Sequence, residues 1–312
     1  MKVGIFLSYI GLGSNIMHLA YCHEIAKKYG PVTVITICKN FKEAVNNDPN
    51  IKEVIYLDKY YKKLSDIFRL SKELSKFDLD TIFIFYPSLR FYLASKLAKI
   101  KNINSYPFFI KKNLHLVNTA KKFVEKKLNI KVCPTETIFY VNPEDKKNAE
   151  KKMDKSVKNI VVGAGSSGPT TKWGERNYID LLKRLNNHGK FYFYIQCGPE
   201  ESIISDTIIK EVGENKCETL SNKKIKDLIP IVSNCDLYIG NDSFGHHITS
   251  QCGIPSLILL LDTPRAYTDY SINQYQILPN EININKITHD VAISPDRIKV
   301  DDVFNKIISI IN

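Results

Sequence analysis

The sequence predicts an α/β protein made of two doubly wound, Rossmann-like domains. Apolar β-branched runs alternate with helical patterns along the chain, and this series restarts near residue 157 after a charged stretch. Continuous apolar runs such as Ile82–Phe85 and Leu257–Leu261 are typical of strands buried on both faces of a parallel sheet. A length of 312 residues also fits two domains. We place these domains at 1–155 and 156–312.

The hydrophobic periodicity predicts the elements of each half in order. In the first half we expect strands at 2–8, 32–38, 53–57 and 80–86, and helices at 15–29, 61–76 and 88–99. In the second half we expect strands at 158–164, 191–197, 236–240 and 256–261, and helices at 175–187, 200–213, 222–234 and 244–252. A last helix over 297–311 follows Ser294-Pro295-Asp296, and it is placed to pack back toward the first domain.

Composition excludes several classes of protein. The chain is 44% hydrophobic and 25% charged, as soluble globular proteins are, and it has no apolar run long enough for a transmembrane helix. Residues 1–8 form a strand pattern and not a signal peptide, so we expect a cytoplasmic protein. The 7 cysteines are scattered without a Cys-x-x-Cys pair, so neither a disulfide framework nor a zinc site is expected.

The net charge of +11 is distributed unevenly. Residues 1–155 carry 28 basic and 15 acidic side chains, whereas 156–312 carry 16 and 18. The densest patch, 96–127, holds nine lysines and one acid, Glu125. A basic half indicates an anionic partner, such as a phosphorylated substrate, a membrane surface or nucleic acid. Nucleic acid is disfavoured, because 38 of the 44 basic residues are lysines and aromatic residues are not interleaved with them.

In doubly wound folds, ligands bind beyond the carboxyl ends of the strands. After the first strand, Gly11 and Gly13 open a helix in a tight turn suited to a substrate cleft. The turn half-matches a dinucleotide fingerprint but lacks the third glycine, and Cys38-Lys39 stands where a ribose-binding acid would follow. A dehydrogenase is therefore disfavoured, whereas a sugar-nucleotide epimerase stays open as an alternative enzyme class.

Three further candidate sites follow strands of the second half. Residues 163–173 include Ser166, Ser167 and Lys172, which suit a diphosphate cradle, although a plain connection packed by Trp173 is the alternative. Glu200 and Glu201 are placed to bind a ribose diol, or merely to favour a helix start.

The last candidate site spans Asp242 to His247. Asp242 or Ser243 suits a simple helix cap, but capping does not explain two adjacent histidines. The free N–H groups at this helix start suit a diphosphate. A metal pair at His246 and His247 is not expected, because adjacent helical residues face different ways.

Together these sites resemble a glycosyltransferase of the GT-B architecture, and the chain resembles glycosyltransferase family 9, the ADP-heptose:lipopolysaccharide heptosyltransferase group. The most specific stretch is 228–255, which is similar to the family's Asp-Ser/Thr-Gly-x-x-His helix start and the following Gly-x-Pro. Asp242, Ser243 and His247 match this motif, whereas Phe244 replaces the glycine, and Gly245 and His246 occupy the variable positions.

Weaker similarities extend along the chain. Trp173 matches the family's Lys-x-Trp-Pro block, with Lys172 one position later than usual and Gly174 in place of proline. Gly198 with Glu200 or Glu201 is similar to the family's Gly-x-x-x-Glu loop, whose acid contacts the donor nucleoside. The segments 114–128, 262–264 and 293–297 are also similar to family segments.

The resemblance implies an inverting, metal-independent transfer of a sugar, heptose first, to a lipopolysaccharide core or a related surface glycan. The donor is then a nucleotide-diphosphate sugar, with ADP-heptose as the first candidate, and no further cofactor is implied. Asp242 to His247 with Ser166, Ser167 and Lys172 would stabilise the departing diphosphate, and Glu200 or Glu201 would hold the ribose. The anionic glycan or glycolipid acceptor would bind near Gly11 and Gly13, at the cytoplasmic face of the inner membrane.

One departure concerns the catalytic base. The turn 13–18 aligns with the family's Gly-Asp-x-Leu-Leu turn, but Ser14 replaces the aspartate, and a serine hydroxyl is not a general base near neutral pH. Three alternatives follow: His18 supplies the base one helical turn on, the acceptor is placed differently with a base elsewhere, or the protein is weak or inactive and binds sugar nucleotides without transfer. Transfer of a different sugar to another glycan or to a protein is the remaining alternative.

Overall fold

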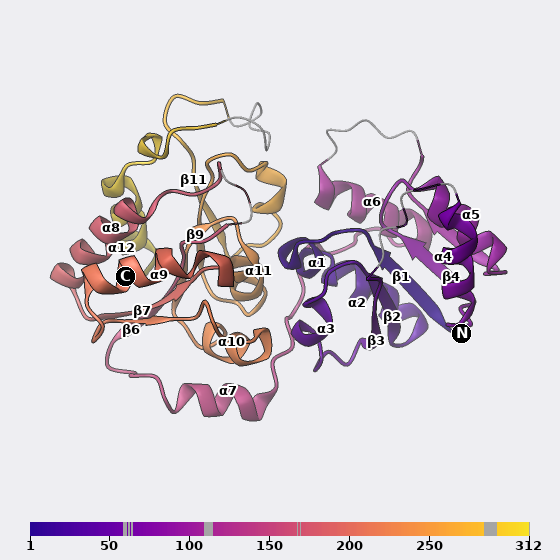
Figure 1. Cartoon of the computed structure of the whole chain (residues 1–312), viewed down its shortest axis with the longest axis horizontal. Coiled ribbons are helices and arrows are strands. Elements are labelled where there is room, and N and C mark those ends of the chain that lie inside the picture. The colour runs from indigo at the N-terminus through magenta and orange to yellow at the C-terminus, as the bar shows by residue number, and fades with distance from the viewer. Residues whose placement is uncertain are drawn as a thin grey trace. The chain divides into compact units, whose positions relative to one another are not determined.

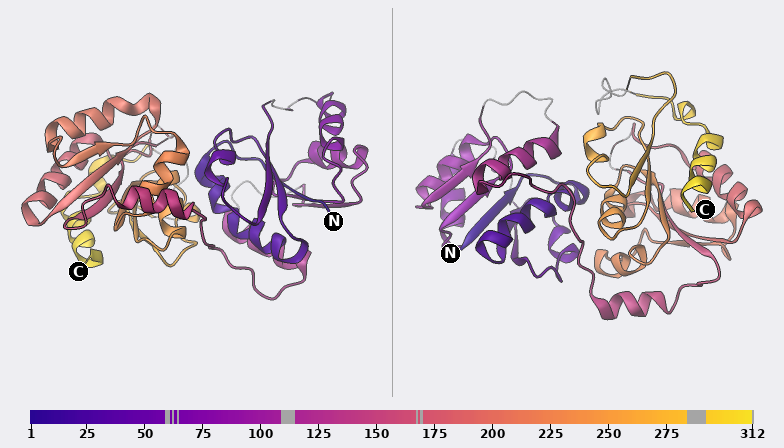
Figure 2. Two further views of the ribbon diagram at one scale, coloured as in Figure 1. Left: turned by 90° about the horizontal axis from the view of Figure 1, so that it is seen from below. Right: turned by 180° about the vertical axis from the view of Figure 1, so that it is seen from behind.

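The computed structural model describes residues 1–58, 61, 63, 65–108, 115–166, 168, 170–283 and 292–311. The chain divides into two compact units, Met1–Thr137 and Ile138–Asn312. Each unit is built on its own parallel sheet with helices on both faces, so the predicted α/β class with two doubly wound sheets is confirmed (Figures 1 and 2). Within the described ranges, no helix is both long and apolar enough to cross a membrane.

The division between the units lies earlier in the chain than the boundary at 155 that the sequence analysis gave. Residues 138–155 belong to the second unit, because α7 (Pro143–Glu150) packs against α10 (Ile225–Val232). The side-chain amide of Asn234 also donates a hydrogen bond to the carbonyl of Lys146 (2.8 Å). The sequence predicts a junction between the domains here because the stretch is charged, but the stretch forms the helix α7, which packs on the second unit.

The first sheet has the strand order β3-β2-β1-β4-β5. Its strands are β1 (Val3–Leu7), β2 (Val32–Thr36), β3 (Ile51–Tyr56), β4 (Thr81–Ile84) and β5 (Asn102–Ser105). Its helices are α1 (Leu12–Met17), α2 (Leu19–Tyr29), α3 (Phe41–Ala44), α4 (Asp66–Ser75), α5 (Leu89–Leu97) and α6 (Leu116–Leu128). The polar strand β5 and the single-turn α3 lack the apolar periodicity of the other elements and were not predicted. The Lys-rich helix α6 was not predicted either, although its apolar residues recur at helical spacing and are buried: Val117, Ala120, Phe123, Val124 and Leu128.

The predicted helix 15–29 is two helices that meet at His18. The His18 ring lies among the rings of Tyr9, Tyr21 and Phe85, with centroid separations of 4.7–5.7 Å. Its Nδ1 donates to the carbonyl of Ser14 (2.7 Å), while Nε2 is buried without a hydrogen-bond partner. Burial disfavours the charged ring and lowers the pKa of His18 to about 4.

The second sheet has the strand order β11-β10-β9-β6-β7-β8. Its strands are β6 (Lys158–Gly163), β7 (Phe191–Gln196), β8 (Cys217–Thr219), β9 (Leu237–Asn241), β10 (Ser256–Leu259) and β11 (Gln274–Ile277). Its remaining helices are α8 (Glu175–His188), α9 (Ser202–Val212), α11 (Phe244–Gln251) and α12 (Val300–Ile311), with short 3₁₀ turns at Pro199–Glu201, Arg265–Tyr267 and Pro295–Arg297. The short strands β8 and β11 were not predicted.

The last helix, α12, packs on α8 of its own unit. Val303 and Ile307 join the apolar cluster that α8 and α9 form over the sheet. On the rim, Arg184 of α8 forms an ion pair with Asp301, and its guanidinium lies 4.3 Å from the centre of the Phe304 ring. The final helix therefore completes the core of the second unit, where the sequence analysis had considered packing toward the first domain.

Two glycines bring the ends of β6 and β9 together. Gly163 and Gly240 are direct neighbours in the parallel register. A Cβ atom on Gly240 would lie 2.4 Å from the carbonyl oxygen of Gly163, and one on Gly163 would lie 1.8 Å from the Tyr238 hydroxyl. Both contacts are impossible for a real Cβ atom, so glycine is required at each position.

We predict that Gly240→Ala destabilises the second unit by about 3 kcal/mol, because an added methyl group has to displace backbone atoms. Urea unfolding followed by the fluorescence of Trp173, the single tryptophan, measures this loss. The control is Gly11→Ala, whose Cβ would meet nothing closer than 4.0 Å. If Gly240→Ala and the wild type have equal unfolding midpoints, the strands accommodate the added methyl group without loss of stability, and the prediction is wrong.

His18 predicts a pH dependence of the first unit. The native ring takes up a proton only near pH 4, whereas an unfolded histidine does so near pH 6.5. The unfolded state therefore binds more protons between these values, and the free energy of unfolding falls by up to about 3 kcal/mol as the pH drops through this window.

His18→Asn keeps a donor toward the Ser14 carbonyl but does not titrate. We expect the unfolding free energy of this variant, measured by chemical denaturation from pH 7 to pH 4, to fall less steeply than that of the wild type. If the unfolding free energies of His18→Asn and the wild type fall equally with pH, His18 is not buried as a neutral ring.

Candidate functional site

The carboxyl ends of β7, β6 and β9 are adjacent in the second sheet, so their loops meet. The buried side chain of Asn241 joins two of them. Its Nδ2 donates to the carbonyl of Ala164 (2.8 Å), and its Oδ1 accepts from the Trp173 backbone N–H and from the Tyr178 hydroxyl (both 3.0 Å). One amide thus fixes the loop after β6, the start of α8 and the end of β9.

The loop after β6 is closed by hydroxyl groups. The hydroxyls of Ser166 and Thr171 are hydrogen-bonded to each other (2.6 Å), and the Ser166 hydroxyl reaches the backbone carbonyl of Asp242 (3.3 Å). Ser167 lies outside the described residues. Trp173 is fully buried and donates its indole N–H to the carbonyl of Ile298 (2.9 Å). It therefore packs the loop, which is the role that the alternative of a plain connection gives to this residue.

Glu201 is the acidic side chain that contacts both the loop after β6 and the loop after β7. Its carboxylate accepts from the backbone N–H groups of Gly198 (3.2 Å) and Ser166 (3.4 Å) and pairs with Lys172. A Cβ atom on Gly165 would lie 2.4 Å from its Oε2, so the loop passes directly over the carboxylate. Glu200 lies on the same 3₁₀ turn, Pro199–Glu201, but is exposed. The structure thus separates the two candidate acids, and only Glu201 lies beside Lys172.

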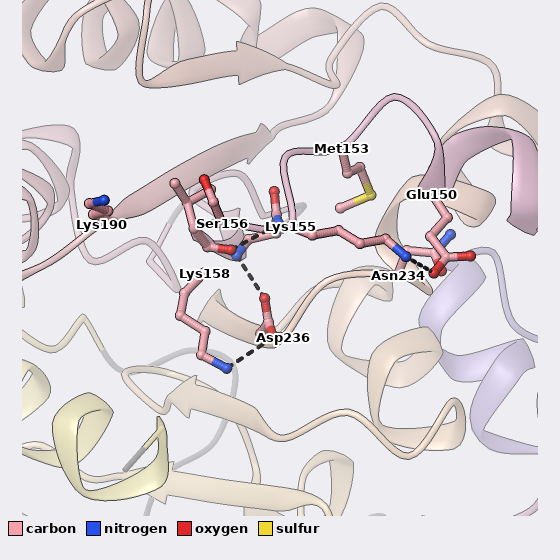
Figure 3. A pocket seen from close by; sticks show the side chains of 10 residues that line it. Glu150, Met153, Lys155, Ser156, Lys158, Lys190, Asn234 and Asp236 are labelled. Carbon is pink, nitrogen blue, oxygen red and sulfur yellow. Dashed lines mark hydrogen bonds and ion pairs between the residues drawn. The ribbon is translucent and has the colours of Figure 1, made fainter.

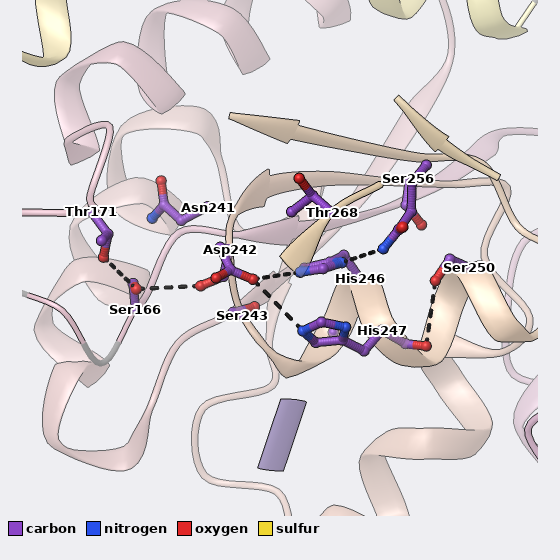
Figure 4. A network of polar contacts seen from close by, with 12 residues as sticks. Ser166, Thr171, Asn241, Asp242, Ser243, His246, His247, Ser250, Ser256 and Thr268 are labelled. Atoms are coloured by element: carbon purple, nitrogen blue, oxygen red, sulfur yellow. Dashed lines mark hydrogen bonds and ion pairs between the residues drawn. The ribbon is translucent and has the colours of Figure 1, made fainter. Parts of the chain in front are cut away.

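The start of α11 carries a polar network around Asp242 (Figure 4). Asp242 Oδ1 lies 2.6 Å from His246 Nε2 and 3.7 Å from His247 Nε2. His247 Nδ1 is hydrogen-bonded to the Tyr270 hydroxyl (2.7 Å). The two adjacent histidines therefore turn toward one carboxylate. The expectation that they face different ways is wrong here, because the acid sits just before the first turn and both rings reach back to it.

No side chain caps α11, although Ser243 occupies its first flanking position. The Ser243 hydroxyl is hydrogen-bonded instead to the Tyr238 hydroxyl (2.9 Å). Phe244, which stands where the family has glycine, is half-buried at the helix start. Glycine is required one position later, because a Cβ atom on Gly245 would lie 2.1 Å from the side-chain oxygen of Gln196.

In the first unit, the predicted turn follows β1. Gly11 and Gly13 lie at the start of α1 with Ser14, which is half-buried. The turn is held by Asn15, whose Nδ2 donates to the carbonyls of Tyr9 (2.9 Å) and Gly11 (2.7 Å). The enclosed Nε2 of His18 has no solvent-exposed surface, so a role as base would require its ring to leave the aromatic cluster.

Sequence reasoning did not single out Asn15, Asn241 or Gln274. Each of the two asparagines places its side-chain amide beside the end of a buried strand. In the sequence, each is a single polar residue next to a more conspicuous candidate: Asn15 follows Ser14, and Asn241 precedes Asp242. Gln274 lies on β11, which has no apolar run. One of its side-chain partners, His246, comes from α11, and nothing in the sequence pairs the two residues.

A hollow of about 360 Å³ lies at the opposite end of the second sheet, where β6 and β9 begin (Figure 3). Four of its charged groups form ion pairs: Lys155 with Glu150 (2.5 Å) and Lys158 with Asp236 (3.3 Å). Asp236 also accepts from the backbone N–H of Asn159 (2.8 Å). Asp236 thus connects the start of β6 with the residue before β9, whereas the candidate site lies at the carboxyl ends of the strands.

The comparisons with known proteins agree with this architecture. The chain covers 99% of its length and 97% of that of the glycosyl transferase family 9 protein from Veillonella parvula (TM-score 0.78, 15% identity). The corresponding shares are 100% and 98% for ADP-heptose lps heptosyltransferase II from E. coli (TM-score 0.75, 14% identity). They are 99% and 100% for E. coli heptosyltransferase WaaC with ADP (TM-score 0.73, 13% identity). At these identities the likeness concerns the fold, which is that of GT-B glycosyltransferases.

No curated protein sequence matches the chain. The model of glycosyltransferase family 9 (heptosyltransferase) matches residues 94–291, which is more than half of the chain. With the two parallel sheets and the polar loops at the carboxyl edge of the second, this match identifies the protein as a glycosyltransferase that belongs to family 9.

Proposed function

We propose that this glycosyltransferase moves a sugar, heptose first, from a nucleotide-diphosphate sugar to a lipopolysaccharide core or a related surface glycan, with inversion and without a metal. ADP-heptose is the first candidate donor, and E. coli heptosyltransferase WaaC, which shares the fold, has been solved with ADP-2-deoxy-2-fluoro heptose. The observation that carries the proposal is the convergence of Lys172, Glu201 and Asp242 at the carboxyl edge of one sheet.

The charges of these groups suggest separate tasks. Lys172 pairs with Glu201, whose carboxylate also contacts the loop at Ser166, and with the N–H groups of α11 Lys172 would stabilise the negative charge that develops on a departing diphosphate. Glu201 would then accept hydrogen bonds from the ribose hydroxyls, after the Lys172 side chain has turned from Glu201 toward the phosphate. A carboxylate repels a diphosphate, so we assign Asp242 to a hydroxyl of the donor sugar instead of the diphosphate contact that the family resemblance implied.

The acceptor would bind to the basic first unit. Ser14 is not a base, and His18 is enclosed, so we expect the proton of the acceptor hydroxyl to be removed by a group outside the turn 11–18. This favours an acceptor placed differently from that of family members that carry the aspartate. A chain that binds sugar nucleotides without transferring them is the competing possibility.

The donor prediction concerns thermal stability. The melting temperature should rise with one class among ADP-, GDP-, UDP- and CDP-sugars without added metal, and at about 100 times the dissociation constant the gain is roughly 2.7 kcal/mol. Asp242→Ala should lose the shift. Asp180→Ala, on the exposed face of α8, removes the same charge and should keep it.

If no nucleotide sugar shifts the melt, or if Asp242→Ala responds as the wild type does, the donor site is not at the start of α11. A shift without turnover on any glycan acceptor would instead support a sugar-nucleotide-binding protein without transfer.

The second prediction concerns the membrane. Lys122, Lys126 and Lys127 are exposed on α6, while Lys111 and Lys112 of the same patch lie outside the described residues. We propose that this patch holds the enzyme at the cytoplasmic face of the inner membrane. Each lysine near an anionic surface contributes about 1 kcal/mol, so replacing these three by alanine should weaken binding to anionic vesicles about 100-fold at low salt.

Replacing Lys147, Lys151 and Lys152 at and just after α7 removes the same charge from the other unit and is the matched control. Vesicle flotation at two salt concentrations compares the variants. If both triple variants lose the same affinity for anionic vesicles, only the net charge of the protein matters. If vesicle binding does not depend on salt or on lipid charge, the lysine patch is not the membrane contact.

A further inference from the structure

His246 is a polar ring that the proposed chemistry does not yet use. It lies in the first turn of α11 with no exposed surface, at a variable position of the family motif. A buried imidazole needs partners for both ring nitrogens, because an unpaired polar atom inside a protein costs roughly 1–3 kcal/mol. Both nitrogens have partners. Nε2 lies 2.6 Å from Asp242 Oδ1 (Figure 4), and Nδ1 lies 3.2 Å from the side-chain nitrogen of Gln274.

The backbone fixes the orientation of the Gln274 amide. Its oxygen accepts from the backbone N–H groups of Tyr270 (3.1 Å) and Ser271 (3.2 Å). Backbone N–H groups only donate, so the oxygen has to face them and the NH₂ group has to face His246. That NH₂ group also only donates, so His246 Nδ1 accepts. The proton of the neutral ring therefore sits on Nε2, where it is donated to Asp242.

We propose that His246, held in its Nε2–H tautomer by Gln274, is a positioning residue that orients the Asp242 carboxylate for the sugar of the donor. This inference rests on the proposed function, in which Asp242 meets a sugar hydroxyl. Asp242 makes both of its histidine contacts through Oδ1, and among the described residues no hydrogen bond reaches Oδ2. The fixed carboxylate thus presents Oδ2 as an acceptor for a hydroxyl group.

The same hydrogen bonds bear on metal binding. Ligand atoms of Asp242, His246 and His247 lie within 4.8 Å of one another, which is close enough to suggest a metal site. A metal at His246 Nε2 would require the ring proton on Nδ1, where it would point at the NH₂ group of Gln274. The residues therefore do not fit a metal held by His246, and they form a hydrogen-bonded relay instead.

The first experiment reads the tautomer without any ligand. NMR of the full chain with isotope-labelled histidine ring nitrogens distinguishes a protonated from a bare nitrogen, and the His246 resonances are identified by their loss in His246→Gln. We expect a protonated Nε2 and a bare Nδ1 at neutral pH. A proton on Nδ1 would overturn the assignment. Gln274→Glu, which offers an acceptor to Nδ1, should add a second proton to the ring.

The second experiment tests positioning. His246→Leu keeps most of the buried volume without a donor, whereas His246→Gln retains an N–H group toward Asp242. Calorimetric titration should show that His246→Leu binds the nucleotide sugar about 10- to 100-fold more weakly but binds the nucleoside diphosphate as the wild type does. His246→Gln should recover most of the loss. Thermal melts verify that each variant is folded.

The outcomes separate the two ideas. If His246→Leu weakens both ligands equally, or if His246→Gln behaves as His246→Leu does, His246 merely supports the fold and the positioning role is wrong. A wild-type chain that binds no nucleotide sugar would overturn the proposed function and with it the donor role of Asp242, whereas the NMR experiment decides the tautomer in either case.

Discussion

The arrangement of the candidate site depends on one buried side chain, the amide of Asn241. It connects the ends of two neighbouring strands with the first residues of α8 through three hydrogen bonds of 2.8–3.0 Å. Two of its partners, the Ala164 carbonyl and the Trp173 N–H, are buried backbone groups that need a hydrogen bond. Because such groups are costly to leave unpaired, the amide determines the path of the loop that carries Ser166 and Lys172. The close approach of Gly163 and Gly240 brings the two strand ends within its reach.

The polar groups around this amide are paired among themselves. Lys172 pairs with Glu201, the Ser166 hydroxyl with that of Thr171, and Asp242 with His246. Under the proposed function, a ligand would exchange partners with groups that are already in place, which would lower the entropy lost on binding. Selectivity would follow from the same pairing, because a ligand with both an anion and hydroxyl groups would satisfy the separated Lys172 and Glu201.

One departure from the family pattern follows local packing. Phe244 is tolerated because the close contact falls on Gly245, which lies against Gln196. At the variable position that follows, His246 is accommodated because Gln274 and Asp242 satisfy both of its nitrogens. Among the described residues of the first unit, no such compensation accompanies Ser14, and the nearby ring of His18 is enclosed by Tyr9, Tyr21 and Phe85.

The sequence by itself determined the fold class, most of the elements and the polar loops of the second unit. Buried parallel strands such as β6 and β9 need continuous apolar runs, and these runs are visible without a structure. Elements that lack such runs, β5, β8 and β11 among them, had no pattern to reveal them. Only the tertiary structure decided which of Glu200 and Glu201 meets Lys172, how two adjacent histidines reach one carboxylate, and that Gln274 fixes the tautomer of His246. These are contacts between segments far apart in the chain, and periodicity reports which face of an element is buried but not which side chain it meets there.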